Sequence, residues 1–599
     1  MERGPYTITT VQEAKLGTVD LQEPNSSGTA PTAGTAQAPE TFEIRGSLTY
    51  PANRTVPSPV VVFVHGNHGS CDSGQDSTTA TCAQYKRNEA GYAYLAENLA
   101  SWGYTTFSVS QDQLMMRQDN STGKGMHQRR LLIAASLDAL TAATTTGLTL
   151  DAHTTIGTEL LGKLDMTRIG LMGHSRGGDA VTNFIDYNRE RTDGTRYPLR
   201  GVVALAPVDY ERKAPTGVPF MTVLPYCDGD VSNLQGARTF ERSQYVDGSN
   251  PFPSIQVTHQ GTNHNWYNSV WFADKAQDGN ANGDAACGNT DPTTQANPAQ
   301  ANIAPNNIRL TGAASYGSPW SYVVDNSDTY NPLVNTKISG DPARMGDQEK
   351  LGLATMSAFI RRYVGGEGAF EPYMTGELSN TDSHLQVPAS ACPTSETGLR
   401  LPCSARVATT YFAPSSERVD LIRPEVENPL TLNALGGGLV GTGFTNPYVD
   451  NGAVTPLPAT TAQGFDWCNP EPDDFATSIL GKSTQPTGAK ACPLPAKAEL
   501  GGQNATRENS PINHSYGRQL SLAWEPGSSA SLTADIPAAS SDLSGLKALA
   551  LDADVNFFDA PTPAVARPAR STRPPPTTRS PRRRTSRSCS PTRPVIRPR

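Results

Sequence analysis

The segment Arg168-Ile-Gly-Leu-Met-Gly-His-Ser-Arg-Gly-Gly-Asp179 places a serine among glycines directly after a short apolar run. Its G-x-S-x-G spacing alone is weak, because a glycine-rich chain contains that pattern by chance, and a tight turn of small residues is the alternative. The flanking residues add specificity, since Ile169–Met172 is typical of a buried strand and Ala180–Tyr187 of a helix. A serine on such a turn is held in a strained bend with its hydroxyl at the carboxyl edge of a sheet. Ser175 is therefore a candidate nucleophile.

Short apolar strands alternate with helices on both sides of this segment. The expected strands are Tyr6–Val11, Phe42–Tyr50, Val60–Val64, Tyr104–Val109, Ile169–Met172, Val202–Leu205, Phe220–Leu224 and Ile255–Val257. The expected helices are Glu89–Trp102, Arg129–Ala143, Ala180–Tyr187 and Gln348–Tyr363. This alternation predicts an α/β domain over residues 1–367, with a mostly parallel sheet covered by helices on both faces. An insertion rich in Asn, Gly, Asp, Thr and Pro interrupts it at residues 279–345.

The remaining residues have a different pattern. Residues 368–560 contain alternating segments such as Arg518–Trp524 and Ala548–Phe557, which predict a β-rich, sandwich-like C-terminal domain. Residues 561–599 are rich in Arg and Pro and are typical of a disordered basic tail. The change comes abruptly after Asn556–Asp559, inside a strand pattern, so we favour a frameshift artefact that truncates the β-rich domain.

Length and charge restrict the class of protein. At 599 residues the chain is too long for one ordinary domain, and no apolar run approaches a transmembrane helix. The formal charge is −8, but residues 567–599 hold 11 Arg and no acidic residue, which leaves −19 on the remainder. An acidic body argues against nucleic acid as the main partner.

Eight of the nine cysteines fall into neighbouring pairs. The pairs are Cys71 with Cys82, Cys227 with Cys287, Cys392 with Cys403, and Cys468 with Cys492. An even set without a CxxC pattern predicts disulfides and hence an exported protein, although sequence cannot fix the connectivity and buried free thiols are the alternative. The residues from Met1 to Tyr6 show no signal peptide, so either the true start lies upstream, which we favour, or the expectation of export is wrong.

A serine nucleophile needs a base, and the base needs an orienting acid. In this architecture the order along the chain is serine, acid, histidine, each after a strand. Asp228 follows the strand Phe220–Leu224, and His264 follows Ile255–Val257, which makes Ser175, Asp228 and His264 the expected triad. Asp230 is the alternative acid. His259 is the alternative base, although a packed or solvated histidine is the simpler interpretation of it.

The same chemistry requires donors for a developing oxyanion. His65-Gly66 comes directly after the first core strand, so the backbone N–H groups of Asn67 and Arg176 are the expected donors, with a plain tight turn as the alternative. Trp266 and Tyr267 follow the base and are candidates for substrate binding or for core packing.

Taken together, the strand ending in His65-Gly66, the Gly173–Gly178 turn and the later Asp and His resemble the α/β-hydrolase superfamily. The nearest resemblance is to the group of cutinase-like polyester hydrolases, chlorophyllases and platelet-activating-factor acetylhydrolases, and Gly4-Pro-Tyr6 resembles the start of the secreted polyesterases. The insertion and the C-terminal region depart from that compact pattern.

The expected function is a secreted serine hydrolase that cleaves carboxylic esters, small or polymeric, through an acyl-enzyme and without a required cofactor. A peptidase or an acyltransferase on the same fold is an alternative, as is a polymer-binding protein with a vestigial hydrolase domain. The sequence leaves substrate identity and oligomeric state open.

The insertion also contains half of a calcium-loop pattern. Oxygen-bearing side chains stand at alternate positions, Asp278, Asn280, Asn282 and Asp284, with a glycine at the sixth. Asn289 occupies the place expected for Glu, so a structural Ca²⁺ site competes with a polar turn-rich loop.

Overall fold

The structure is a computed structural model of the whole chain. It describes residues 2–21, 40–76, 79–117, 125–211, 213–225, 228, 230–231, 234–246, 248–259, 262, 264–271, 347–376, 407–423, 432–444, 448–450, 454–456, 465–469, 490–491, 519–522, 524 and 527–551.

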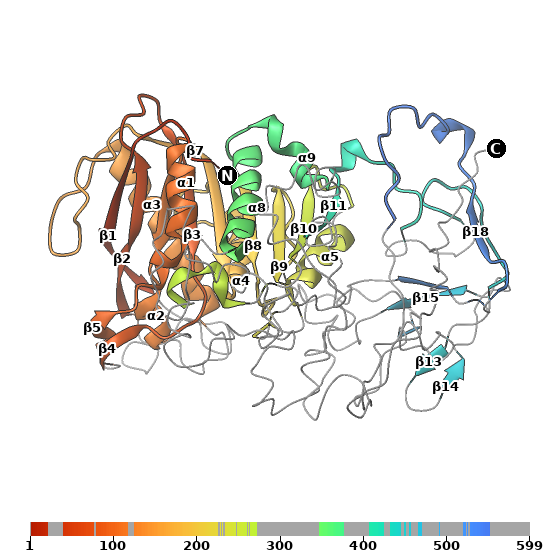
Figure 1. Ribbon diagram of the computed structural model, residues 1–599, viewed down its shortest axis with the longest axis horizontal. Coiled ribbons are helices and arrows are strands. Elements are labelled where there is room, and N and C mark those ends of the chain that lie inside the picture. Colours follow the sequence, from red (N-terminus) through yellow and green to blue (C-terminus); the bar gives the residue numbers. More distant parts are fainter. Residues whose placement is uncertain are drawn as a thin grey trace, which may run out of the picture.

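A nine-stranded mixed sheet forms the centre of the molecule, with the order β1-β2-β6-β3-β7-β8-β9-β10-β11 (Figure 1). Its strands are β1 (Ile8–Leu21), β2 (Glu40–Pro51), β3 (Ser58–Val64), β6 (Thr105–Val109), β7 (Leu164–His174), β8 (Leu199–Leu205), β9 (Phe220–Pro225), β10 (Ser254–His259) and β11 (Val407–Phe412). The strands from β6 to β10 in this order run parallel, and β1, β2 and β11 add antiparallel edges. The carboxyl ends of the parallel strands therefore share one edge, where the loops that carry function gather.

Helices cover both faces of the sheet. The first face packs against α3 (Met126–Thr145) and α4 (Arg176–Glu190), and the other against α1 (Ala93–Ser101) and α8 (Asp347–Tyr363). The β3 strand explains this division, because Val60, Val62 and Val64 join one apolar cluster while Val61 and Phe63 join the other. A strand buried on both faces needs such a continuous apolar run. The α/β prediction is confirmed.

The boundaries differ from the sequence expectation in ways that follow local geometry. The helix expected at Glu89–Trp102 opens with a 3-10 turn, Asn88–Tyr92, before α1 begins. The α4 helix begins at Arg176, directly after the serine, instead of at Ala180. A hairpin that the sequence did not predict, β4 (Cys71–Asp76) with β5 (Thr81–Tyr85), follows β3.

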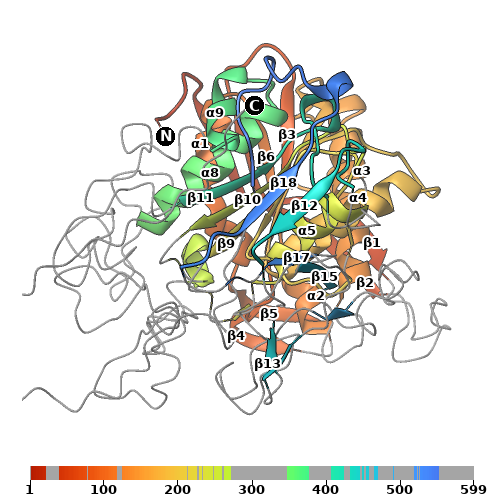
Figure 2. The same ribbon diagram turned by 90° about the vertical axis from the view of Figure 1, so that its right-hand side faces the viewer.

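The C-terminal part contributes to the central sheet before it forms small sheets of its own. The β11 strand pairs antiparallel with β10, so the sheet extends past the boundary expected at residue 367. Further on, β12 (Leu439–Thr442) lies beside β18 (Ser531–Ala534), as Figure 2 shows.

The other short strands are β13 (Tyr448–Asp450) with β14 (Val454–Pro456), and β15 (Phe465–Asn469) between β16 (Lys490–Ala491) and β17 (Gln519–Leu522). The strand expected at Ala548–Phe557 is absent from its described part, residues 548–551. The insertion at 279–345 and the tail at 561–599 lie outside the described residues. Among the helices that the structure describes, none combines the length and apolar character needed to cross a bilayer.

Candidate active site

Ser175 lies on the turn between β7 and α4, at the carboxyl edge of the sheet. Its φ and ψ are 57° and −122°, a conformation that is costly for a residue with a Cβ. Backbone bonds hold it, because its N–H donates to Leu205 O at 2.9 Å and its carbonyl accepts from Gly178 N at 2.9 Å. The chain thus presents one strained serine above the first turn of a helix, whose N-terminus favours negative charge.

The glycines around the serine are required by close approach of other segments. A Cβ atom on Gly177 would collide with the carbonyl oxygen of Val64, so α4 can pass under β3 only without a side chain there. A Cβ atom on Gly66 would lie 2.6 Å from the Cβ of Ser175. The segment that follows β3 therefore packs directly against the serine.

His264 and Asp228 meet at the same edge, in the segments after β10 and β9. His264 Nδ1 donates to Asp228 Oδ2 at 2.8 Å, and the two side chains are only 2% and 1% exposed. The other oxygen of Asp228 accepts from the backbone N–H groups of Asp230 at 3.0 Å and Val231 at 2.6 Å. Burial raises the pKa of Asp228, and the neighbouring His264 opposes that rise. The carboxylate is fixed on both oxygens and orients the imidazole.

The outer nitrogen of His264 faces a second carboxylate. Its Nε2 lies 3.3 Å from Asp230 Oδ2, and the Asp230 side chain is 57% exposed. Among the described residues, no hydrogen bond joins the Ser175 hydroxyl to His264. The base is nevertheless adjacent to the serine turn, since His174 Nε2 donates to the His264 carbonyl oxygen at 3.0 Å. The structure brings acid and base into contact, and the residue before Ser175 contacts the backbone of the base.

An indole ring that the sequence interpretation missed lies under this site. Trp271 stacks parallel to His264 at 6.4 Å between ring centroids and packs on His174 at 4.6 Å. Its Nε1 donates to Asn88 Oδ1 at 2.7 Å, and its ring limits the space at Gly66. Sequence proximity favoured Trp266 and Tyr267 instead, and only the turn at residues 265–267 brings Trp271 back beneath the base.

Tyr267 lies in the core. Its ring is fully buried, and its hydroxyl bonds His259 Nδ1 at 2.8 Å and Thr262 Oγ1 at 3.0 Å. These contacts support core packing as the role of Tyr267, instead of substrate binding. His259 ends β10 and also bonds Thr355 Oγ1 at 2.9 Å, and its burial lowers its pKa to about 3. His259 is thus a packed neutral histidine, and the Trp266 side chain lies outside the described part of the structure.

The segment after β3 is built on a buried polar network. His65 Nδ1 donates to the Gly66 carbonyl at 2.9 Å, and its Nε2 accepts from Gln111 N at 2.8 Å. Gln111 Nε2 donates in turn to the His65 carbonyl at 2.7 Å, and the buried Arg129 bonds Gln111 Oε1. Burial lowers the pKa of His65 to about 3, so this ring is neutral. Its two hydrogen bonds support the loop after β3.

Both expected oxyanion donors belong to segments that adjoin the serine. Asn67 follows Gly66, which packs on Ser175, and Arg176 is the first residue of α4. The Arg176 side chain extends over the Tyr210 ring, 5.9 Å from its centroid.

Asn88 connects the loop after β3 to the indole ring of Trp271. Its Nδ2 donates to Gly69 O at 2.9 Å and to Asp112 Oδ1 at 2.7 Å. The buried Glu89 lies next to it, and burial together with the charge of Asp112 raises the pKa of Glu89 to about 7. Burial also raises the pKa of Asp112.

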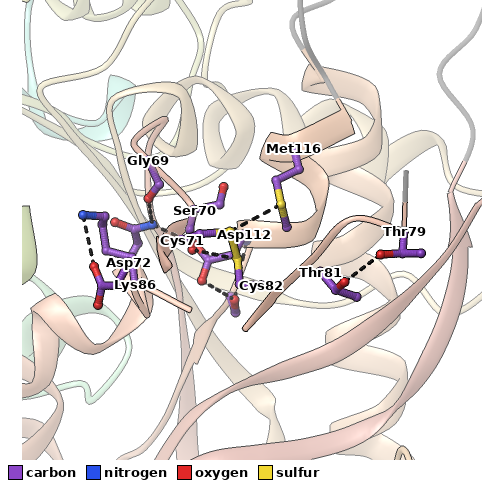
Figure 3. Close-up of a disulfide and its surroundings, with 12 residues drawn as sticks. Gly69, Ser70, Cys71, Asp72, Thr79, Thr81, Cys82, Lys86, Asp112 and Met116 are labelled. Carbon is purple, nitrogen blue, oxygen red and sulfur yellow. Dashed lines mark hydrogen bonds and ion pairs between the residues drawn. A yellow bond between two sulfur atoms is a disulfide. The ribbon is translucent and has the colours of Figure 1, made fainter. Parts of the chain in front are cut away.

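One predicted disulfide, Cys71–Cys82, is present and closes the β4–β5 hairpin beside this loop (Figure 3). The Ser70 carbonyl accepts from Lys86 N at 2.9 Å, so the two ends of the hairpin are also tied by a backbone bond. Cys468 lies in β15, and its side chain lies outside the described part of the structure. The other predicted disulfide residues, Cys227, Cys287, Cys392, Cys403 and Cys492, lie outside the described residues.

The expected calcium residues, Asp278, Asn280, Asn282 and Asp284, lie outside the described residues as well. Within the part of the chain that is described, no group of three or more His, Cys, Asp or Glu side chains is placed to hold a metal ion. The described part of this edge contains a strained serine, an imidazole held by a carboxylate and the backbone N–H groups of the serine turn.

Comparison of the chain with models of known protein families and with curated protein sequences finds no match.

Proposed function

We propose that this protein is a serine hydrolase of the α/β-hydrolase type that cleaves carboxylic esters through an acyl-enzyme. The observation that carries the proposal is a strained Ser175 on the β7–α4 turn, next to the His174 that contacts the backbone of His264, whose imidazole Asp228 holds at 2.8 Å. Strain of this kind persists where the surroundings enforce it, and it clusters at catalytic positions. A plain turn of small residues would not need a buried acid–base pair beside it.

Catalysis begins when the Ser175 hydroxyl rotates toward His264 Nε2, the nitrogen that also lies beside Asp230. Nε2 then removes the proton of Ser175 Oγ while Oγ forms a bond to the substrate carbonyl carbon. The carbonyl oxygen gains negative charge, which the backbone N–H groups of Asn67 and Arg176 stabilise. Asp228 stabilises the imidazolium that has formed and keeps its orientation.

The tetrahedral intermediate collapses when the bond to the leaving oxygen breaks. His264 returns its proton to that oxygen, and the alcohol departs. Water then attacks the acyl-enzyme, gives a proton to His264 and releases the carboxylic acid, with the proton passing back to Ser175 Oγ. Each step uses groups that this chain supplies, so the proposal requires no cofactor.

Two other activities use the same machinery. A peptidase would break an amide with the same residues, and an acyltransferase would pass the acyl group to an alcohol instead of water. A polymer-binding protein with a vestigial hydrolase domain is a third possibility, but the intact acid–base pair favours an active enzyme.

The β-rich C-terminal region is proposed to be a sandwich-like accessory domain. The Cys71–Cys82 disulfide supports export to an oxidising compartment, because such bonds persist there.

The proposal is tested with a fluorophosphonate probe on the full chain and on Ser175→Ala. Labelling of the wild type alone, together with turnover of p-nitrophenyl esters of increasing chain length, is the expected result. Ester hydrolysis that survives in Ser175→Ala would remove the mechanism.

A further inference from the structure

We infer that the exposed carboxylate of Asp230 makes this site selective for esters whose leaving group carries a positive charge. The inference rests on the proposed function and concerns the side of the site from which the alcohol departs. It is based on the position of the Asp230 carboxylate beside His264 Nε2, the atom that transfers a proton to the departing alcohol.

The two carboxylates at His264 differ in environment. Asp228 contacts Nδ1 and is buried, whereas Asp230 lies 3.3 Å from Nε2 with 57% of its side chain exposed. The backbone N–H of Asp230 donates to Asp228 Oδ1 at 3.0 Å, which ties the exposed acid to the buried one. Asp230 is therefore held on the solvent side of the imidazole, at the nitrogen that performs proton transfer.

The chemistry of ester cleavage places the leaving group at that nitrogen. His264 Nε2 delivers its proton to the leaving oxygen, so this oxygen must come within hydrogen-bond distance of Nε2. Asp230 Oδ2 lies at about that distance in the structure. The departing alcohol must then pass next to a carboxylate.

The cationic side chain of the serine turn lies on an aromatic ring. Arg176 lies over the Tyr210 ring, in the segment that follows β8, while Asp230 lies beside the base after β9. A cation about 5 Å from an exposed carboxylate gains roughly five- to tenfold in relative rate over a neutral isostere. The leaving-group side of the site therefore has negative charge, and a quaternary or primary ammonium alcohol suits it.

A different role for Asp230 gives a different result. If the carboxylate only helped to orient His264, its removal would slow all esters by the same factor. Selectivity therefore shows in the ratio of two substrates, not in the rate of either one.

The experiment compares acetylcholine with its neutral isostere 3,3-dimethylbutyl acetate, using the full chain. The wild type is expected to have a kcat/KM for the cationic ester roughly five- to tenfold higher. In Asp230→Asn the ratio is expected to fall to near one. Asp151→Asn is the matched control, because Asp151 is exposed and its bond from His153 N at 2.7 Å is one that asparagine can keep. It lies beyond the opposite edge of the sheet, and the ratio should not change.

Equal ratios in the wild type and Asp230→Asn would overturn the inference, as would an equal loss for both esters. Where the acetyl group is too small for the site, a phosphonothioate with a choline-like thiol leaving group and its carbon analogue give the same ratio from rates of Ser175 labelling. Absence of labelling by these reagents and by a fluorophosphonate would refute the proposed function itself, and this inference with it. Labelling without charge preference would refute only the role of Asp230.

Discussion

His264 Nδ1 and Asp228 Oδ2 are 2.8 Å apart, in a contact from which solvent is almost completely excluded. Asp228 could orient a histidine only if its own oxygens were fixed, and two backbone N–H groups bond the oxygen that His264 leaves free. The carboxylate therefore sets both the tautomer and the direction of the ring. Nε2 is left as the nitrogen available for proton transfer.

Replacing Asp228 by asparagine should abolish most activity without unfolding the protein. An asparagine amide can favour the other imidazole tautomer, which leaves Nε2 protonated and unable to accept the serine proton. We expect kcat for ester hydrolysis to fall roughly a thousandfold or more, as for orienting acids of this kind. Asp151→Asn is the control of equal charge change, and circular dichroism checks folding. A variant Asp228→Asn with near-normal kcat would show that another group, with Asp230 first in line, orients the base.

The strain at Ser175 should be measurable as stability. At φ 57° and ψ −122°, a glycine relieves the cost that a Cβ imposes, whereas alanine retains it. We expect Ser175→Gly to unfold in urea with a free energy about 1 kcal/mol higher than Ser175→Ala, although both are inactive. Equal stability of the two variants would mean that the turn is relaxed, and the structural argument for a nucleophile would lose its basis.

The hydrogen bond between Trp271 and Asn88 should affect catalysis more than binding. Trp271→Phe keeps a ring beneath His264 but leaves the buried Asn88 Oδ1 without its donor, so the loop after β3 loses a support. We expect kcat, and the rate of fluorophosphonate labelling, to fall roughly tenfold with little change in KM, because misplaced oxyanion donors cost transition-state energy. Trp102→Phe is the matched control, since its Nε1 donates to Glu2 O at a distant surface. An effect of the same size in both variants would indicate general destabilisation.

Glu89 should make stability fall as the pH rises toward neutrality. Its folded-state pKa is raised, so between the ordinary value of 4.5 and about 7 the folded protein holds a proton that the unfolded chain has released. The contribution of Glu89 to stability is therefore fully present below pH 4.5 and is lost as the pH rises to about 7, by on the order of 3 kcal/mol. Glu89→Gln should flatten this part of the pH profile in urea unfolding, while the exposed Glu190→Gln should not. A profile that stays unchanged in Glu89→Gln would show that Asp112 holds the proton instead.

The central strands could be predicted because their physical signal is local. Val60–Val64 is apolar and β-branched throughout, and only a strand covered on both faces needs that pattern. The contact between Asp228 and His264 could be predicted for a similar reason, since each residue follows such a strand. Asn88 and Trp271 could not be predicted, because their roles come from hydrogen bonds and stacking between segments about 180 residues apart.

In the C-terminal region, too, contacts between distant segments could not be predicted from the sequence. The β11 strand has no apolar run like that of β3, and its place at the sheet edge depends on pairing with β10, about 150 residues earlier. Short alternating segments also predict strands too freely, since Leu549 and Leu551 are exposed in a stretch without strand structure. The local hydrophobic pattern of a segment predicts whether the segment is buried, but it does not predict which other segment packs against it.

The Cys71–Cys82 bond should stabilise the protein and also hold the loop that precedes it. The bond closes a hairpin of sequence separation 11, for which the loss of chain entropy in the unfolded state is worth about 2–4 kcal/mol. The hairpin begins two residues after Gly69, whose carbonyl Asn88 holds, so a loosened hairpin should also lower kcat. We expect the double variant Cys71→Ser, Cys82→Ser to lose that stability in urea unfolding and several-fold in kcat, and dithiothreitol to reproduce both effects on the wild type. Cys589→Ser, outside the paired set, is the control. Full activity of the double variant would show that the loop beside Ser175 is held by the Asn88 contacts alone.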